Sequence, residues 1–151
     1  MACGIDVIRS TKARLRSILV LLLVGAAVPA AGPAYAGGGA AAAAAVGSAG
    51  LQSCSATAGK VLYDCVAGVL DRMSGTLNRY DPPEARSALQ TAASQLRAAS
   101  NKAQALSAIS QCRSVFASLV KQVSASNGHP AGLSAVIGVL SKAAQLIQSK
   151  G

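Results

Sequence analysis

Residues suited to catalysis are scarce in this chain. Its 151 residues include a single histidine, His129, and only five carboxylate side chains. Nucleophilic catalysis needs a nucleophile, a base and an orienting group, and acid–base catalysis by carboxylates needs a pair in which one pKa is raised. His129 stands beside a proline in a segment expected to be a loop, and no two carboxylates mark such a pair. The composition therefore predicts a protein that is not an enzyme.

Aromatic side chains are nearly as rare. The chain has no tryptophan, one phenylalanine and three tyrosines. Nucleic-acid and sugar sites usually combine aromatic platforms with cations, and phosphate sites often use a glycine-rich loop after a strand. Neither pattern occurs, so we expect no nucleic-acid partner.

Close metal-ligand spacing is also absent. Cys54, Cys65, Cys112 and His129 nominally form the set of three sulfurs and one nitrogen that zinc accepts. The intervals of 11, 47 and 17 residues between them match no compact zinc module. We therefore expect no metal and no cofactor.

The N-terminal segment has the three parts of an export signal. Four cations precede an apolar run over residues 18–28, and Pro29 follows it. Ala34 and Ala36 are the small residues that a signal peptidase reads, which places cleavage after Ala36. We expect residues 1–36 to be a cleaved signal peptide and the protein to be exported, either to the periplasm or out of the cell. An uncleaved anchor is the alternative, but a spanning helix needs about 20 apolar residues.

Charge is dilute in the predicted mature chain. Residues 37–151 carry ten lysines and arginines and four carboxylates, which gives a net charge of +6. The cations are spread from Lys60 to Lys150, and no three of them are adjacent. Such a charge favours weak contact with anionic surfaces, such as phospholipid headgroups, although solubility alone also explains it.

The mature chain divides at its glycines and prolines. Residues 37–50 are almost entirely glycine and alanine, which we interpret as a flexible tether. A helical bundle domain is then expected over residues 51–151. Its first helix is predicted from Ser53 or Ser55 to Gly75, because apolar residues recur there at helical intervals, namely Val61, Leu62, Cys65, Val66, Val69, Leu70 and Met73.

A second helix start is predicted at residues 81–84. Asp81 is suited to capping, Pro82 to the first helical position and Glu84 to the first turn. No glycine or further proline occurs from there to Ser126, but the phase of the apolar pattern changes near Ser100–Asn101. We therefore predict a break there, although one continuous helix is the alternative.

The last helix is predicted to begin near Pro130 and to reach the C-terminus. Gly128 is suited to ending the preceding helix in a left-handed conformation, and Gly138 is a candidate for a close helix crossing. No segment alternates as a strand would. The fold class predicted is all-α, a small antiparallel bundle of three to four helices.

Three cysteines remain after export, and an oxidising compartment favours a disulfide. With Cys54 and Cys65 assigned to one helix, their separation forbids a bond between them. The heights along the helices favour Cys65–Cys112, with Cys54–Cys112 as the alternative pairing. Cys54 would then be a free thiol or the link to a second copy of the chain. A set of three buried thiols with no bond is the remaining alternative.

Binding is the class of function that survives these exclusions. We expect an exported helical-bundle interaction module that engages another protein or the envelope surface, with Arg79 and Tyr80 as the candidate contact. The alternative for Tyr80 is that it closes a loop over the end of the bundle. The alternative function is a carrier that holds a small hydrophobic ligand or lipid inside the bundle.

Overall fold

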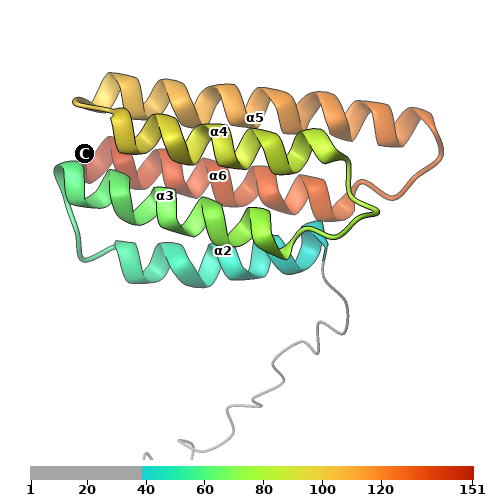
Figure 1. Cartoon of the computed structure of the whole chain (residues 1–151), viewed down its shortest axis with the longest axis horizontal. Coiled ribbons are helices and arrows are strands. Elements are labelled where there is room, and N and C mark those ends of the chain that lie inside the picture. Colours follow the sequence, from blue (N-terminus) through green and yellow to red (C-terminus); the bar gives the residue numbers. More distant parts are fainter. Residues whose placement is uncertain (1–38) are drawn as a thin grey trace, which may run out of the picture. The chain divides into compact units, whose positions relative to one another are not determined.

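The structure is a computed structural model that describes residues 39–151, and within that range the regular secondary structure is entirely helical. It comprises α2 (Ala40–Cys54), α3 (Gly59–Thr76), α4 (Pro83–Ala98), α5 (Lys102–Ala125) and α6 (Ala131–Lys150) (Figure 1). The all-α prediction is confirmed, but the described part of the chain has five helices rather than three or four. The predicted signal peptide, residues 1–36, lies outside the described residues.

The five helices form a closed ring. Each helix packs antiparallel on the next one along the chain, and α6 returns to pack on α2 (Figure 1). Because the number of helices is odd, α2 and α6 run parallel. Gly132 near the start of α6 accordingly lies against Ala40 and Ala41, while Lys150 at its end donates a hydrogen bond to the Ser55 carbonyl oxygen.

One continuous apolar core fills the ring. Ser74 is the one buried polar side chain among the described residues, and its hydroxyl donates to the Asp71 carbonyl oxygen at 2.8 Å. A buried hydroxyl with a partner avoids the cost of an unsatisfied polar group. The largest fully buried side chains are Phe116, Leu62, Leu70, Met73, Leu89, Leu96, Ile109, Leu140 and Ile147.

The interpretation of residues 37–50 as a flexible tether is wrong, because α2 occupies most of that segment. Alanine has the highest helix propensity, and its small side chain lets two helix backbones approach closely. Gly47 faces the side chains of Met73 and Val139, and Leu51 is buried. The bundle therefore begins at Ala40 rather than at residue 51.

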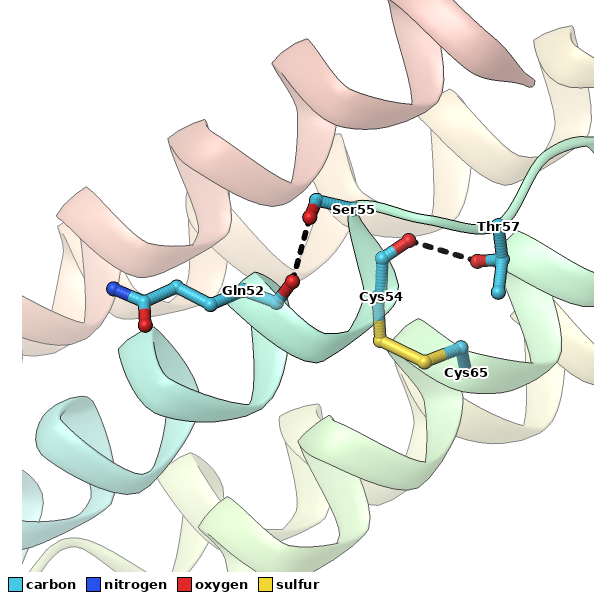
Figure 2. Close-up of a disulfide and its surroundings, with 5 residues drawn as sticks. All are labelled: Gln52, Cys54, Ser55, Thr57 and Cys65. Carbon is cyan, nitrogen blue, oxygen red and sulfur yellow. Dashed lines mark hydrogen bonds between the residues drawn. A yellow bond between two sulfur atoms is a disulfide. The ribbon is translucent and has the colours of Figure 1, made fainter.

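The first predicted helix is in fact the end of α2 and the whole of α3. A turn over residues 55–58 separates them, and Gly59 begins α3 with a φ of 57°. Hydroxyl groups in the turn bond to carbonyl oxygens at the end of α2: Ser55 to Gln52 at 2.6 Å and Thr57 to Cys54 at 2.8 Å (Figure 2). Ser55 therefore helps to end a helix rather than to begin one.

The predicted break near Ser100–Asn101 is confirmed. Helix α4 ends at Ala98 and α5 begins at Lys102. Asn101 is the N-cap of α5, and its side-chain oxygen accepts the Gln104 N–H at 3.0 Å. The Gln104 side chain in turn accepts the Ser100 N–H at 2.8 Å, so the two interactions satisfy groups on both sides of the break.

Helix α6 differs from the prediction in its details. Pro130 is the N-cap rather than the first helical residue, and Asn127, not Gly128, takes the left-handed conformation with a φ of 57°. Gly138 has open space beside it and so mediates no close crossing. By length and composition α6 could cross a membrane, but here it packs on α2, α3 and α5.

Candidate interaction surface

The loop between α3 and α4 is held in one conformation by its own polar groups. The Asn78 side-chain oxygen accepts the N–H groups of Tyr80 at 2.8 Å and of Asp81 at 3.2 Å. An Asp81 carboxylate oxygen accepts the Asn78 N–H at 2.9 Å, and Arg86 donates to the Leu77 carbonyl oxygen at 2.6 Å. Two prolines then follow, so the backbone on both sides of Tyr80 is restrained.

Tyr80 projects from this loop into solvent. Its side chain is 81% exposed, the largest exposure of any large apolar residue in the described part of the chain. The Arg79 guanidinium lies 5.0 Å from the centre of the Tyr80 ring and donates to the phenol oxygen at 2.9 Å. Tyr80 therefore does not close the loop over the bundle. The structure brings the two predicted contact residues together on an exposed, restrained turn.

Asp81 caps a helix other than the one it precedes. Its Oδ1 accepts the Ala40 N–H, at the start of α2, at 3.2 Å, whereas α4 begins at Pro83 without a side-chain cap. The prediction that Asp81 caps α4, with Pro82 in the first helical position, is therefore wrong. The partners are 41 residues apart in the sequence, so no local pattern could have indicated this contact.

The disulfide joins Cys54 to Cys65, with their Cα atoms 5.8 Å apart (Figure 2). The predicted Cys65–Cys112 pairing is wrong, and so is the alternative, Cys54–Cys112. Both predictions placed Cys54 and Cys65 on one helix, but the turn at residues 55–58 puts them on two adjacent helices. Cys54 is consequently not a free thiol and is not available to link two chains.

Cys112 is the free cysteine in the described residues. It is 3% exposed on α5, and this burial raises the pKa of its thiol to about 12. A thiol with so high a pKa is almost entirely protonated at neutral pH, and it is the thiolate that reacts. The environment of Cys112 therefore favours a structural thiol over a reactive one.

A groove runs along the outer seam between α4 and α5. Its volume is about 300 Å³, and its lining includes the small side chains of Ala88, Ala92, Ala108 and Cys112. Val115, which is 38% exposed, forms part of its wall. This groove could not be predicted from the sequence, because it depends on which small residues of two separate helices face each other.

Charge is distributed unevenly over the described residues. The four carboxylates lie between Asp64 and Glu84, and two of them form ion pairs, Lys60–Asp64 and Arg97–Asp71. From residue 85 to residue 151 there are seven lysines and arginines and no carboxylate side chain. The part of the bundle from residue 85 onward, which contains most of α4 and all of α5 and α6, is therefore the more basic part.

His129 is exposed in the loop before α6. Within residues 39–151, no three histidine, cysteine or acidic side chains are grouped so that they could hold a metal ion. No protein-family model, curated protein or solved structure matches the chain. Function is therefore inferred from the chain's own residues.

Proposed function

We propose that this protein is an exported, non-enzymatic interaction module, and that the loop over residues 77–82 is its contact with a partner in the cell envelope or outside the cell. The observation that carries the proposal is the exposed Tyr80, stacked with Arg79 on a restrained loop. Tyrosine and arginine are enriched at binding hot spots. A contact that is already ordered loses less conformational entropy on binding than a flexible one.

The disulfide supports export, because stable disulfides form and persist in oxidising compartments. Export also agrees with the position at which the first described helix begins. If cleavage follows Ala36, the mature protein begins three residues before α2.

Site-specific photo-crosslinking in exporting cells tests this proposal. A photoreactive phenylalanine analogue at position 80 should crosslink to a discrete partner. The same analogue at position 61 should not, and Val61 is a matched control because it is also exposed, at 63%. Replacing Tyr80 with alanine should then weaken binding of the captured partner about 30-fold, the effect typical of a hot spot. Equal crosslinking from both positions, or unchanged affinity in Tyr80→Ala, would contradict the proposal.

A carrier of a small hydrophobic ligand is the second candidate, and the groove between α4 and α5 favours it. Its volume of about 300 Å³ is at the lower end of the range for small-molecule sites. The ligand would lie in this outer groove, since fully buried side chains already fill the interior. Native mass spectrometry of the protein from its exported fraction distinguishes the two candidates. A bound apolar molecule that is lost from a Val115→Glu variant supports the carrier, whereas a bare chain favours the interaction module.

A further inference from the structure

A small cleft lies between the exposed loop and the start of α4. Its volume is about 230 Å³, and its lining includes Leu77, Arg79, Asp81, Pro82, Pro83 and Arg86. Sites for drug-sized molecules usually begin at about 300 Å³, so a cleft of this size is suited to one or two side chains of a partner. The cleft therefore belongs to the same surface as Tyr80 and can add specificity to a contact made there.

Two guanidinium groups line this cleft, those of Arg79 and Arg86, and both residues are exposed. A guanidinium has five N–H donors. Among the described residues, Arg79 donates to the Tyr80 phenol oxygen and Arg86 to the Leu77 carbonyl oxygen, and neither arginine forms an ion pair. Most of the donors of both groups are therefore open to a ligand.

The carboxylate in the cleft lining, that of Asp81, does not neutralise these arginines. Its Oδ1 accepts the Ala40 N–H at 3.2 Å and its Oδ2 accepts the Asn78 N–H at 2.9 Å, so backbone groups engage both oxygens. Glu84, the next carboxylate along the chain, lines the groove between α4 and α5 instead. The lining thus carries two positive charges and one negative charge, a net charge of +1, and the positive charges lack partners of opposite sign.

The donors of Arg79 are already positioned. The Tyr80 ring lies 5.0 Å from the guanidinium carbon and its phenol oxygen accepts an N–H at 2.9 Å, while Pro82 and Pro83 restrain the backbone that follows. A side chain that is held in place loses less freedom on binding. The planar fork of a guanidinium matches the two oxygens of a carboxylate, and such charge-assisted pairs are among the stronger hydrogen bonds in proteins.

We propose that this cleft receives a carboxylate from an acidic segment of the partner protein, with Arg79 and Arg86 as its hydrogen-bond donors. This inference rests on the proposed function, because it names the chemistry of the partner that the loop contacts. A single carboxylate matches the net charge of +1 in the lining. The exposed face of Tyr80 lies beside the cleft and packs on the apolar part of the same segment.

An anionic lipid surface fits this region less well than an acidic peptide. Attraction to headgroups depends on the charge summed over a face of the protein. Residues 77–86 contain two arginines and two carboxylates, so their formal charges cancel. A carboxylate within the cleft instead meets the arginines directly. We therefore expect peptides with a carboxylate to bind and anionic vesicles not to bind.

Selection of a random peptide library on the immobilised mature chain tests the inference. One format displays the peptides internally, and a second gives them a free C-terminus, which distinguishes a side-chain carboxylate from a chain end. We expect the enriched internal peptides to share an aspartate or a glutamate, unless enrichment is confined to the format with free chain ends. Enriched internal peptides without a common carboxylate, or no enrichment in either format, would overturn the inference.

Fluorescence anisotropy of an enriched peptide then assigns the site. Arg79→Gln should weaken binding about 10- to 100-fold, and replacing the peptide carboxylate by an amide should have the same effect. Arg79→Lys keeps the charge but loses the fork, so it should restore only part of the affinity. Arg113→Gln is the matched control, because Arg113 is exposed on α5 and lies outside the cleft lining. Equal weakening by Arg79→Gln and Arg113→Gln would show a general charge effect and overturn the inference.

Failure of this inference can be distinguished from failure of the proposed function. If position 80 crosslinks to a partner segment that has no carboxylate, the proposed function stands and this inference falls. If enriched peptides bind through Arg79 but position 80 captures no partner, the cleft chemistry stands and the proposed function falls. Binding to vesicles of phosphatidylglycerol and phosphatidylcholine that is lost in Arg79→Gln would assign the cleft to lipid headgroups and overturn the inference.

Discussion

Asp81 shows how a single side chain stabilises a distant element. Its carboxylate accepts the Ala40 N–H of α2 and the Asn78 N–H of its own loop. We expect Asp81→Ala to lower the free energy of unfolding by about 1 kcal/mol, the usual cost of losing a helix cap, as measured by urea denaturation. Asp64→Ala is the control, because its exposed ion pair with Lys60 should contribute about 0.3–0.5 kcal/mol. A smaller effect for Asp81→Ala than for Asp64→Ala would contradict this role.

Cys112 gives a prediction about pH. Burial raises the pKa of its thiol from 9.0 to about 12, so the protonated form is retained in the fold well above neutral pH. At pH 8 the native thiol should react with iodoacetamide about 1,000-fold more slowly than in urea, since only the thiolate is alkylated. The native rate should keep rising about tenfold per pH unit beyond pH 9, whereas the rate in urea should level off there. A plateau of the native alkylation rate near pH 9 would contradict the raised pKa of the Cys112 thiol.

The same shift has a consequence for stability. The pKa of Cys112 in the folded protein lies above the unfolded value of 9.0. The contribution of this thiol to the free energy of unfolding is therefore fully present below pH 9 and decreases as the pH rises toward 12. A Cys112→Ala variant should lack this alkaline component, although it leaves a small cavity in the core.

At the scale of helices, two glycines predict opposite effects of the same substitution. A Cβ atom at Gly47 in α2 would lie 2.5 Å from the Met73 sulfur and 2.7 Å from a Val139 methyl group, both of which are buried. Gly47→Ala should therefore destabilise the protein by about 1–3 kcal/mol through overpacking. Gly138→Ala in α6 meets open space and should stabilise it by about 0.5–1 kcal/mol. Thermal unfolding of the two variants checks both signs, and a stabilised Gly47→Ala would contradict the close packing of α2.

Local signals in the sequence predicted some boundaries of these helices and missed others. The break before α5 was predictable because its capping groups lie within five residues of one another. The Asn101 side chain accepts the Gln104 N–H, and the Gln104 side chain accepts the Ser100 N–H. Helix α2 was missed because a run of alanines has no apolar periodicity, and its burial depends on close approach to α3 and α6. The cysteine pairing was missed for the same reason, since it follows from where α2 ends.

The predicted contact site, Arg79 and Tyr80, was also only partly predictable from the sequence. Arg79 and Tyr80 were identified from residue type, because both are common at binding hot spots. Their exposure depends on hydrogen bonds that Asn78 and Asp81 make within the loop, and the Asp81 bond to Ala40 crosses to another helix. Residue type thus indicated the candidate contact side chains, but only the fold determines that they point into solvent.

At the scale of the whole molecule, one disulfide cross-links the described part of the chain by joining α2 to α3, and it can be mapped directly. Digestion with trypsin without reduction should give the peptide that ends at Lys60 joined to the peptide of residues 61–72, because Cys54 and Cys65 are bonded. The peptide of residues 103–113, which contains Cys112, should be recovered as a free thiol. The intact mass of protein from the exported fraction should be two hydrogens below that of the fully reduced chain, with Gly37 as the first residue if cleavage follows Ala36. Recovery of residues 61–72 joined to residues 103–113 would contradict the Cys54–Cys65 pairing, because α2 would then have no covalent tie to α3.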